Sequence, residues 1–349
     1  MQLRVFLLFL ITGIQLSQPQ SSSFAIRTVA FYNVENLFDT INDPLTYDDS
    51  RTPEGKDNWN GKRYTLKIDH LAKVISQIGS DKTSHPPDIL GIAEIENMHV
   101  LKDLVSHKLL APYAYHIVHK DSPDRRGIDV AFLFKSDVFI PIDFKNYRLL
   151  LKDEYANTVY TRDQLLISGL LDGEQFYFIV NHWPSRRGGE HESRYKRIKA
   201  ASLNKRIIDS IQRIDPLARI ISMGDFNDDP TDPSFKRILK TKTENEADGA
   251  YALINPMESL FQKGMGSLAY GDSWNLFDQF YFTSSLLKEN TIESYYHWKT
   301  QIFNPPFLTL SEGKYKGYPF RTYAGGTYTG GYSDHFPVYL YLIKPIKNN

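Results

Sequence analysis

Residues 220–228 read Ile-Ile-Ser-Met-Gly-Asp-Phe-Asn-Asp, an apolar run that stops abruptly at Asp225, Asn227 and Asp228. A short apolar run bounded by turn formers predicts a buried strand. In α/β folds, strand ends commonly hold functional sites, because the sheet fixes the residues while loops leave room for a ligand. The stretch therefore predicts a central strand with a site at its end. The alternative is that Asp225 and Asn227 only form a turn, since the segment is rich in turn residues.

The same pattern, an apolar strand that meets polar side chains, recurs along the chain. A carboxylate such as Glu94, placed directly after a fully apolar strand, would be costly to bury unpaired. A single Asp-His or Asn-His pair, by contrast, is also typical of ordinary surface hydrogen bonding. The four further clusters are Asn33-Val34-Glu35-Asn36, Glu94-Ile95-Glu96-Asn97, Asn181-His182-Trp183-Pro184-Ser185-Arg186 and, just before a strand, Ser333-Asp334-His335-Phe336-Pro337.

The residue types in these clusters favour a particular chemistry. Carboxylates and amides are hard oxygen ligands, which suit Mg²⁺ or Mn²⁺, with Ca²⁺ as a further option. The chain has no cysteine and no His-x-x-x-His pair, which argues against a structural zinc site. A histidine can activate water when a second carboxylate fixes its tautomer, and Asp278 is the predicted orienting partner of His335.

Hydrophobic periodicity predicts an α/β protein. Apolar strands are expected at residues 28–34, 89–93, 130–134, 164–170, 176–181, 219–223, 278–282 and 338–342, with helices near 66–78, 100–105 and 194–214. Because no linker interrupts this alternation, we expect one α/β domain over residues 26–349. The irregular stretches 42–63 and 304–332 are expected to be ordered loops, either ligand-binding segments or simple insertions.

The N-terminus has the order of a secretory signal. Arg4 is followed by an almost wholly apolar run over residues 5–16 and a small polar stretch up to Ala25. The run falls short of the roughly 20 residues that span a bilayer as a helix. Residues 1–25 therefore predict a signal peptide and an exported protein, periplasmic or extracellular, with no stable membrane span after its removal. An uncleaved anchor or a buried strand is the alternative.

The charge balance bears on the substrate. The chain carries 41 basic and 41 acidic residues, so it is neutral overall. Tight non-specific binding to nucleic acid usually needs an excess of basic residues, at least locally. Neutrality counts against that mode of binding, but it leaves a small phosphoester or a local basic patch open. We predict no protein partner.

Taken in order, the five clusters resemble the motif series of the endonuclease/exonuclease/phosphatase superfamily, which includes deoxyribonuclease I. The resemblance covers nearly all of residues 28–342, and its most specific parts are Gly-Asp-Phe-Asn and Ser-Asp-His-Phe-Pro. Residues 33–39 and 181–186 look like a bacterial exported subgroup. The resemblance implies a four-layer α/β sandwich of the deoxyribonuclease I type, with two packed mixed β-sheets flanked by helices and the site at one edge.

The resemblance also implies roles for individual residues. Glu94 is expected to be the principal metal ligand beside Asn33, and Asp334 is expected to help hold a metal. His335 acts as general base or contacts the phosphate, and Asp278 orients it. Asp225 positions or deprotonates the attacking water. The remaining expected roles are contacts with phosphoryl oxygens by Asn227 and His182, and orientation of His182 by Asp129.

Two arginines follow His182 closely. Arg186 and Arg187 are predicted to clamp phosphate charge, and the alternative is that they only form the solvated start of a helix. The leading functional prediction is a metal-dependent phosphodiesterase or nuclease acting on DNA or RNA. The alternatives are an exported phosphomonoesterase, a sphingomyelinase-like lipid phosphodiesterase and a non-catalytic binding module. No Gly-x-Ser-x-Gly motif supports a serine hydrolase.

Overall fold

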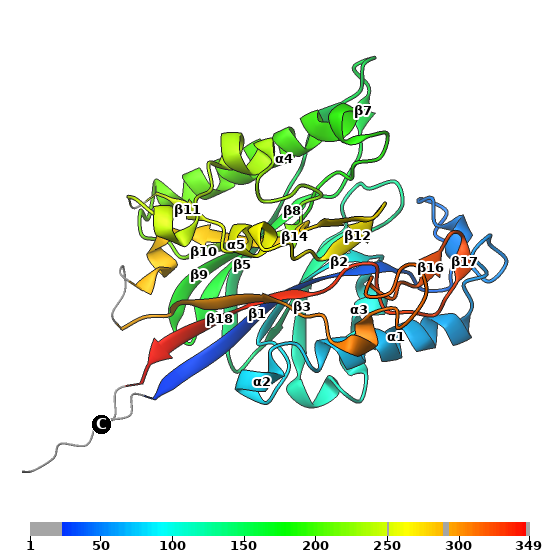
Figure 1. Cartoon of the computed structure of the whole chain (residues 1–349), viewed down its shortest axis with the longest axis horizontal. Coiled ribbons are helices and arrows are strands. Elements are labelled where there is room, and N and C mark those ends of the chain that lie inside the picture. The colour runs from blue at the N-terminus through cyan, green and yellow to red at the C-terminus, as the bar shows by residue number, and fades with distance from the viewer. Residues whose placement is uncertain (1–22, 250, 289–292, 347–349) are drawn as a thin grey trace, which may run out of the picture.

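The computed structural model of the chain describes residues 23–249, 251–288 and 293–346. Within these residues two six-stranded sheets pack face to face, and helices cover both outer faces (Figure 1). The predicted four-layer α/β sandwich is therefore confirmed.

The first sheet has the strand order β15-β18-β1-β2-β4-β3. β1 and β2 run parallel, whereas the other neighbouring strands run antiparallel. β1 and β2 are apolar over most of their length because both faces of this sheet are covered. The strands are β1 (Phe24–Leu37), β2 (Ile89–Ile95), β3 (Tyr115–His119), β4 (Asp129–Lys135), β15 (Tyr296–Ile302) and β18 (Val338–Pro345).

The second sheet has the strand order β11-β14-β10-β9-β8-β5. It repeats the plan of the first, because β9 and β10 form its one parallel pair among the described residues. The strands are β5 (Phe139–Tyr147), β8 (Gln164–Leu171), β9 (Glu174–His182), β10 (Ile220–Asp225), β11 (Leu253–Ile254) and β14 (Asp278–Thr283).

The two sheets meet in a close-packed apolar layer. Phe132 of β4 and Phe178 of β9 face each other with ring centroids 5.3 Å apart. At Gly91 of β2 a Cβ atom would lie only 2.8 Å from Sδ of Met223 on β10. The glycine leaves the space that the Met223 side chain fills, and this contact packs β2 against β10, two of the strands that carry site residues.

The helices divide between the two outer faces (Figure 1). α1 packs Leu71 and Ile75 against the core under the first sheet, and α4 packs Ile207 and Ile208 over the second. These helices complete the four layers.

The helices are α1 (Gly61–Ile75), α2 (Ser80–Thr83), α3 (Met98–Ser106), α4 (Glu190–Gln212) and α5 (Met257–Gln262), with a π-helical turn η3 (Ser234–Leu239). The short elements are η1 (Asp49–Arg51), η2 (Ala111–Tyr113), η4 (Glu244–Glu246), η5 (Ser284–Leu286), η7 (Pro306–Leu308), β6 (Leu151–Lys152), β7 (Thr158–Val159), β12 (Leu268–Tyr270), β13 (Ser273–Asn275), β16 (Tyr323–Ala324) and β17 (Thr327–Tyr328).

The element boundaries differ from the predicted ones in places. α1 begins earlier than the predicted helix, because the side chain of Asn60 accepts a hydrogen bond from the backbone N–H of Arg63 and caps it. β5 was not predicted, because it is an edge strand whose Ile140 and Ile142 are exposed and give no buried face.

The N-terminal prediction lies mostly beyond the described part. Residues 1–22 of the predicted signal peptide are outside it, while Phe24 and Ala25 pair with Pro345 and Lys344 of β18. No helix in the described ranges has the length and apolarity needed to cross a membrane.

Candidate active site

The predicted polar residues converge at one edge of the two sheets. His182 and Asp278 are the direct register partners of Asp225 on either side of it, at the ends of β9, β14 and β10. Asn33 of β1 reaches across from the first sheet, and its Nδ2 donates to Oδ2 of Asp225 at 3.0 Å. Side chains from distant parts of the sequence therefore share one site.

Asp225 is the centre of this site. Its Oδ2 lies 3.6 Å from Nε2 of His182 and 3.9 Å from Nε2 of His335. Its Oδ1 accepts a hydrogen bond of 2.9 Å from the backbone N–H of Asn227. Since the two imidazole distances exceed a good hydrogen bond, both rings remain able to donate to a water or phosphate oxygen placed between them.

A chain of hydrogen bonds holds His335. Nδ1 of its ring lies 2.6 Å from Oδ2 of Asp278, as predicted, and Ser267 Oγ donates to the same carboxylate oxygen at 2.6 Å. Ser333 Oγ accepts from the backbone N–H of His335 and donates to the carbonyl oxygen of Asn33. The loop before β18 is thus fixed to β1 and β14, which points Nε2 of His335 towards Asp225.

The two imidazoles have opposite pKa shifts. Burial lowers the pKa of His335, but the carboxylates of Asp278 and Asp334 outweigh burial and bring the pKa well above its ordinary value. Burial, reinforced by the positive charges of Arg162 and Arg126, brings the pKa of His182 well below its ordinary value. At neutral pH one ring is therefore charged and the other neutral.

The carboxylate between the rings is itself perturbed. Burial raises the pKa of Asp225 to about 7, although the positive charge of His335 opposes the rise. A carboxyl group with a pKa near neutrality is suited to accept a proton from water.

Glu94 is held in an unusual backbone conformation. Its φ is 64°, in the left-handed region, which re-aims its side chain away from the regular pleat of β2. Its Oε2 accepts a hydrogen bond from the backbone N–H of Asn36 at 3.0 Å, and its Oε1 lies 3.8 Å from Nε2 of His182. The carboxylate is partly exposed and has coordination capacity left for a cation.

The donor set around Glu94 fits a hard divalent cation. The Glu94 carboxylate and the Oδ1 atom of Asn33, which accepts only the backbone N–H of Glu35 in the described residues, are oxygen ligands. Mg²⁺ is commonly bound by one or two carboxylates while it keeps several waters. Asp334 lies further out: its Oδ2 pairs with Arg321 at 3.0 Å and its Oδ1 lies 3.8 Å from Nε2 of His335.

Asn227 and Trp183 connect the loops after β10 and β9. Asn227 has a φ of 51° and donates from Nδ2 to the carbonyl oxygen of Trp183 at 3.0 Å. The indole of Trp183 is buried and packs edge-on against Phe226, with ring centroids 4.8 Å apart. One Nδ2–H of Asn227 stays available for the predicted contact with a phosphoryl oxygen.

Asp129 does not take the predicted place beside His182. Its carboxylate accepts hydrogen bonds from the backbone N–H and the hydroxyl of Ser122, and its Oδ2 lies 3.5 Å from Nε2 of His119. Nδ1 of His182 is buried without a hydrogen-bond partner among the described residues. The physical reason is that Asp129 lies at the start of β4, where a neighbouring strand supplies a nearer histidine.

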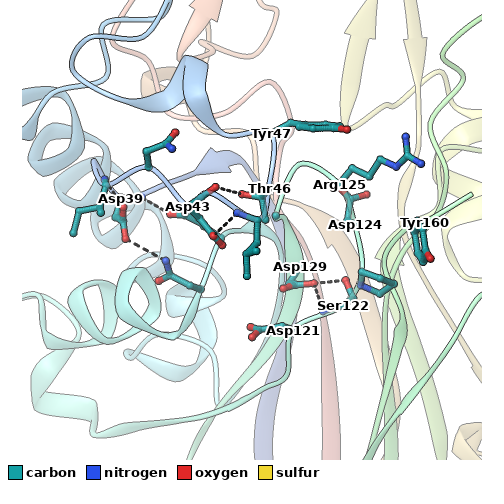
Figure 2. A pocket seen from close by; sticks show the side chains of 17 residues that line it. Asp39, Asp43, Thr46, Tyr47, Asp121, Ser122, Asp124, Arg125, Asp129 and Tyr160 are labelled. Atoms are coloured by element: carbon teal, nitrogen blue, oxygen red, sulfur yellow. Dashed lines mark hydrogen bonds between the residues drawn. The ribbon is translucent and has the colours of Figure 1, made fainter.

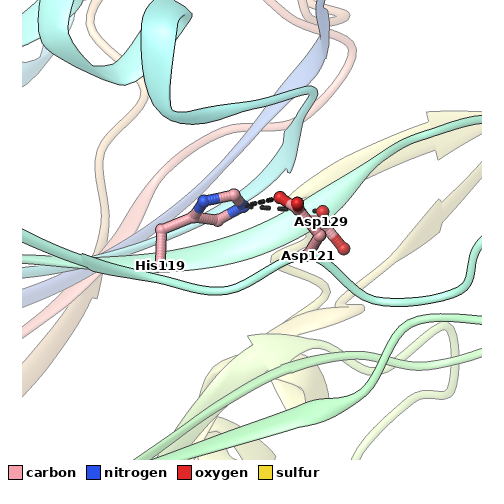
Figure 3. A group of neighbouring side chains, drawn as sticks. All are labelled: His119, Asp121 and Asp129. Carbon is pink, nitrogen blue, oxygen red and sulfur yellow. Dashed lines mark ion pairs between the residues drawn. The ribbon is translucent and has the colours of Figure 1, made fainter.

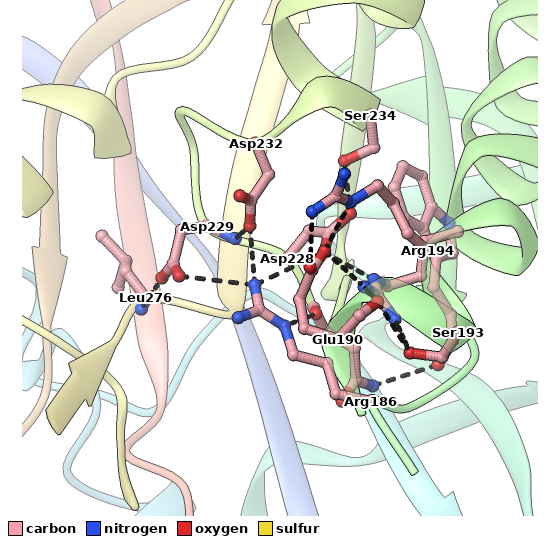
Figure 4. A network of polar contacts seen from close by, with 12 residues as sticks. Arg186, Glu190, Ser193, Arg194, Asp228, Asp229, Asp232, Ser234 and Leu276 are labelled. Carbon is pink, nitrogen blue, oxygen red and sulfur yellow. Dashed lines mark hydrogen bonds and ion pairs between the residues drawn. The ribbon is translucent and has the colours of Figure 1, made fainter. Parts of the chain in front are cut away.

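Arg186 also departs from the predicted phosphate clamp. Its guanidinium donates to the carbonyl oxygen of Asn227 and contacts Asp228, Asp229 and Asp232 at 2.6–3.4 Å (Figure 4). This cation already neutralises a cluster of carboxylates in the loop after β10. Arg187 is exposed.

A pocket of about 860 Å³ lies beyond the C-terminal end of β2 (Figure 2). Its wall includes Glu96 and Asn97, which directly follow the end of β2. Most of its charged groups are acidic, and two tyrosines, Tyr47 and Tyr160, contribute aromatic surface. The remaining acidic side chains are Asp39, Asp43, Asp121, Asp124 and Asp129, with Arg125 as a basic one.

Sequence reasoning missed two residues of the site. Ser267 holds the carboxylate of Asp278, and Arg162 donates to the carbonyl oxygen of Trp183 at 2.7 Å while pairing with Asp124. Ser267 directly precedes the short strand β12, and Arg162 lies in a short polar stretch before β8 that was not among the five clusters. No signal in a single sequence distinguishes this serine or arginine from the many others.

Comparisons with known proteins agree with this architecture. Residues 28–344 match the model of the endonuclease/exonuclease/phosphatase family. A comparison with curated protein sequences gives no match.

Solved structures with the same fold include several members of this group. D. rerio TDP2 complexed with a single-strand DNA product has a TM-score of 0.54 and 14% identity, over 91% of this chain and 99% of that one. An endonuclease/exonuclease/phosphatase family protein from Bacteroides thetaiotaomicron has a TM-score of 0.53 and 18% identity, over 93% of this chain and 100% of that one. A mannosyl-6-phosphatase from the same species has a TM-score of 0.52 and 17% identity, over 90% of this chain and 99% of that one. The chain belongs to the endonuclease/exonuclease/phosphatase family and is a phosphoester hydrolase.

Proposed function

We propose that this protein is an exported, metal-dependent phosphodiesterase of the nuclease type, in which Asp225 and His335 activate water and stabilise charge on the phosphate. The single observation that carries the proposal is the position of Asp225, which faces two imidazoles and the amide of Asn33 at 3.0–3.9 Å. Export rests on the N-terminal sequence pattern alone.

The metal is proposed from the chemistry of the donors. Glu94 and the amide oxygen of Asn33 would hold Mg²⁺ or Mn²⁺, with Asp334 as a more distant carboxylate. When bound, such a cation polarises a phosphoryl oxygen and neutralises charge that develops on it.

Proton transfer is assigned to Asp225. Its pKa of about 7 leaves a sizeable ionised fraction at neutral pH and makes it basic enough to take a proton from water. His335 is better suited to donation, because Asp278 and Asp334 keep its pKa raised and its ring charged. Its Nε2–H would therefore hydrogen-bond to a non-bridging phosphate oxygen.

His182 and Asn227 would complete the phosphate site. The low pKa of His182 keeps its ring neutral, and a neutral ring with its proton on Nε2 donates one hydrogen bond. The free Nδ2–H of Asn227 adds a second donor. Both groups stabilise a phosphoryl oxygen without adding a full charge.

The charge balance of the site favours a diester over a monoester. Glu94, Asp225, Asp278 and Asp334 are all acidic, and Arg186 is already paired with other carboxylates. A singly charged diester needs less compensating positive charge than a doubly charged monoester. The complex of a structural neighbour, TDP2, with single-strand DNA supports nucleic acid as the first substrate class to test.

A second candidate function follows from the acidic pocket beyond the end of β2. A pocket rich in carboxylates repels a polyanion, whereas hydroxyl groups can donate hydrogen bonds to those oxygens. This favours a small phosphomonoester of a hydroxyl-rich alcohol, and one structural neighbour is a mannosyl-6-phosphatase.

A substrate panel tests these proposals. The full chain would be assayed on bis-p-nitrophenyl phosphate, p-nitrophenyl phosphate, single-stranded DNA, RNA, sugar phosphates and sphingomyelin, with Mg²⁺, Mn²⁺ or a chelator. We expect hydrolysis of the diester that disappears with chelator and in Glu94→Gln, but persists in the surface control Glu192→Gln. Turnover of sugar phosphates alone would establish the second candidate, and sphingomyelin alone a lipid phosphodiesterase. Equal rates with and without chelator would contradict metal dependence, and no turnover at all would indicate a binding module.

A further inference from the structure

A second cluster of metal-binding side chains lies outside the proposed active site. His119 at the end of β3, Asp121 in the following loop and Asp129 at the start of β4 point towards one another (Figure 3). One ligand atom from each residue lies within 4.8 Å of the other two, and this is the one such group of three among the described residues.

The imidazole of His119 has an unsatisfied atom at this point. Its side chain is only 3% exposed, and its Nε2 is buried without a hydrogen-bond partner in the described part of the chain. The same Nε2 lies 3.7 Å from Oδ1 of Asp121 and 3.5 Å from Oδ2 of Asp129. A buried nitrogen aimed at two carboxylates, but bonded to neither, indicates room for a ligand between them.

Hydrogen bonds from Ser122 hold the carboxylate of Asp129 in its orientation. Ser122 donates to Oδ1 of Asp129 from both its backbone N–H and its hydroxyl, which leaves Oδ2 facing His119. Outer hydrogen bonds of this kind fix a ligating carboxylate in metal sites.

We propose that His119, Asp121 and Asp129 form a site for a divalent transition-metal ion of the Zn²⁺ type, separate from the Glu94 site. Two ligands at tetrahedral positions about 2.05 Å from Zn²⁺ are roughly 3.3 Å apart, close to the 3.5 and 3.7 Å of this cluster. An imidazole with two carboxylates suits such an ion better than it suits Mg²⁺, which prefers oxygen alone.

The remaining coordination position would open onto the acidic pocket. Asp121 and Asp129 line its wall, and the Asp121 side chain is 85% exposed (Figure 2). Water would complete the coordination from that side. The bound ion would also offset part of the negative charge of the pocket.

The test measures metal binding directly, so it does not depend on any enzyme activity. The full chain, stripped with a chelator, would be titrated with Co²⁺ in excess Mg²⁺, which occupies all-oxygen sites. Co²⁺ replaces Zn²⁺ and reports nitrogen and oxygen ligation by its visible absorption. We expect one equivalent to bind with the absorption of a low-coordinate site, and Zn²⁺ to displace it.

Four variants decide between this site and others. His119→Gln and the exposed Asp121→Asn should each weaken Co²⁺ binding by at least tenfold, and Asp121→Asn keeps the test valid if His119→Gln fails to fold. The matched control His116→Gln, an exposed histidine of the same strand, and Glu94→Gln should both retain binding. Unchanged Co²⁺ binding in Asp121→Asn, or loss in Glu94→Gln alone, would overturn the proposal, because the cluster would then be only an imidazole packed against two carboxylates.

Discussion

The surroundings of His335 and His182 differ, although both buried rings face Asp225 at similar distances. Behind His335 stands Asp278, which contacts its Nδ1 and keeps its pKa raised. Behind His182 no group bonds to Nδ1 in the described residues, and burial with nearby arginines keeps its pKa low. The charged groups around each buried ring, carboxylates beside His335 and arginines near His182, thus determine whether the histidine acts as a cation or as a neutral donor.

This difference suggests a division of labour around one phosphate. The charged ring compensates negative charge, the neutral ring orients an oxygen, and Asp225 between them takes the proton. Environments that push the pKa values of neighbouring groups apart commonly mark acid and base partners.

Asp225→Asn should have the largest effect, because it removes the proposed base and the carboxylate that both rings face. We expect turnover of a diester to fall by roughly 10³-fold or more. Steady-state kinetics would measure the loss, with Asp209→Asn on the surface of α4 as the matched control. An Asp225→Asn enzyme within tenfold of the native rate would show that another group activates the water.

His335→Gln should reduce turnover by a factor on the order of 10², since an uncharged amide cannot replace the imidazolium. His182→Gln keeps a neutral donor and should cost only about tenfold. The two kcat values, measured side by side, test the asymmetry directly. Equal losses in both variants would contradict it.

Asp278→Asn should change the pH dependence more than the maximal rate. Asp278 raises the pKa of His335, so its removal lowers that pKa and the ring loses its proton at a lower pH. The alkaline limb of the pH–rate profile should therefore move to lower pH, with kcat reduced by roughly tenfold or less at the optimum. An unmoved alkaline limb would mean that the proton on His335 does not matter.

Arg186→Ala should affect stability rather than substrate binding. The change leaves Asp228, Asp229 and Asp232 without their shared cation, and we expect a loss of about 2 kcal/mol in the free energy of unfolding. KM should change by less than about threefold, because the guanidinium is not free for phosphate. A large rise in KM at unchanged stability would instead restore the predicted phosphate clamp.

Much of the fold was predictable from the sequence because its strands are buried. The apolar runs that end at Asp225 and Glu94 correspond to β10 and β2. The edge strand β5 could not be found, since its exposed Ile140 and Ile142 carry no contrast between buried and solvent faces. Hydrophobic patterns predict strands that are buried, but they do not show that a strand lies at the edge of a sheet.

The sequence predicted the site residues that lie in motifs, together with one contact between two of them. The structure joins His335 to Asp278 as expected, because both adjoin strand ends at the same edge. Asp129 was assigned to the wrong histidine, since a sequence does not show which of two rings a carboxylate will face. Ser267 was invisible for a related reason: its contact with Asp278 depends on a loop conformation.

Histidine NMR of the metal-free protein tests the central claim most directly. With ring signals assigned through His335→Gln and His182→Gln, ¹⁵N shifts at pH 7 report how many protons each ring carries. We predict two protons on His335 and one on His182, with no titration of His182 near its ordinary pKa. A neutral His335 at pH 7, or two rings that titrate alike, would contradict it.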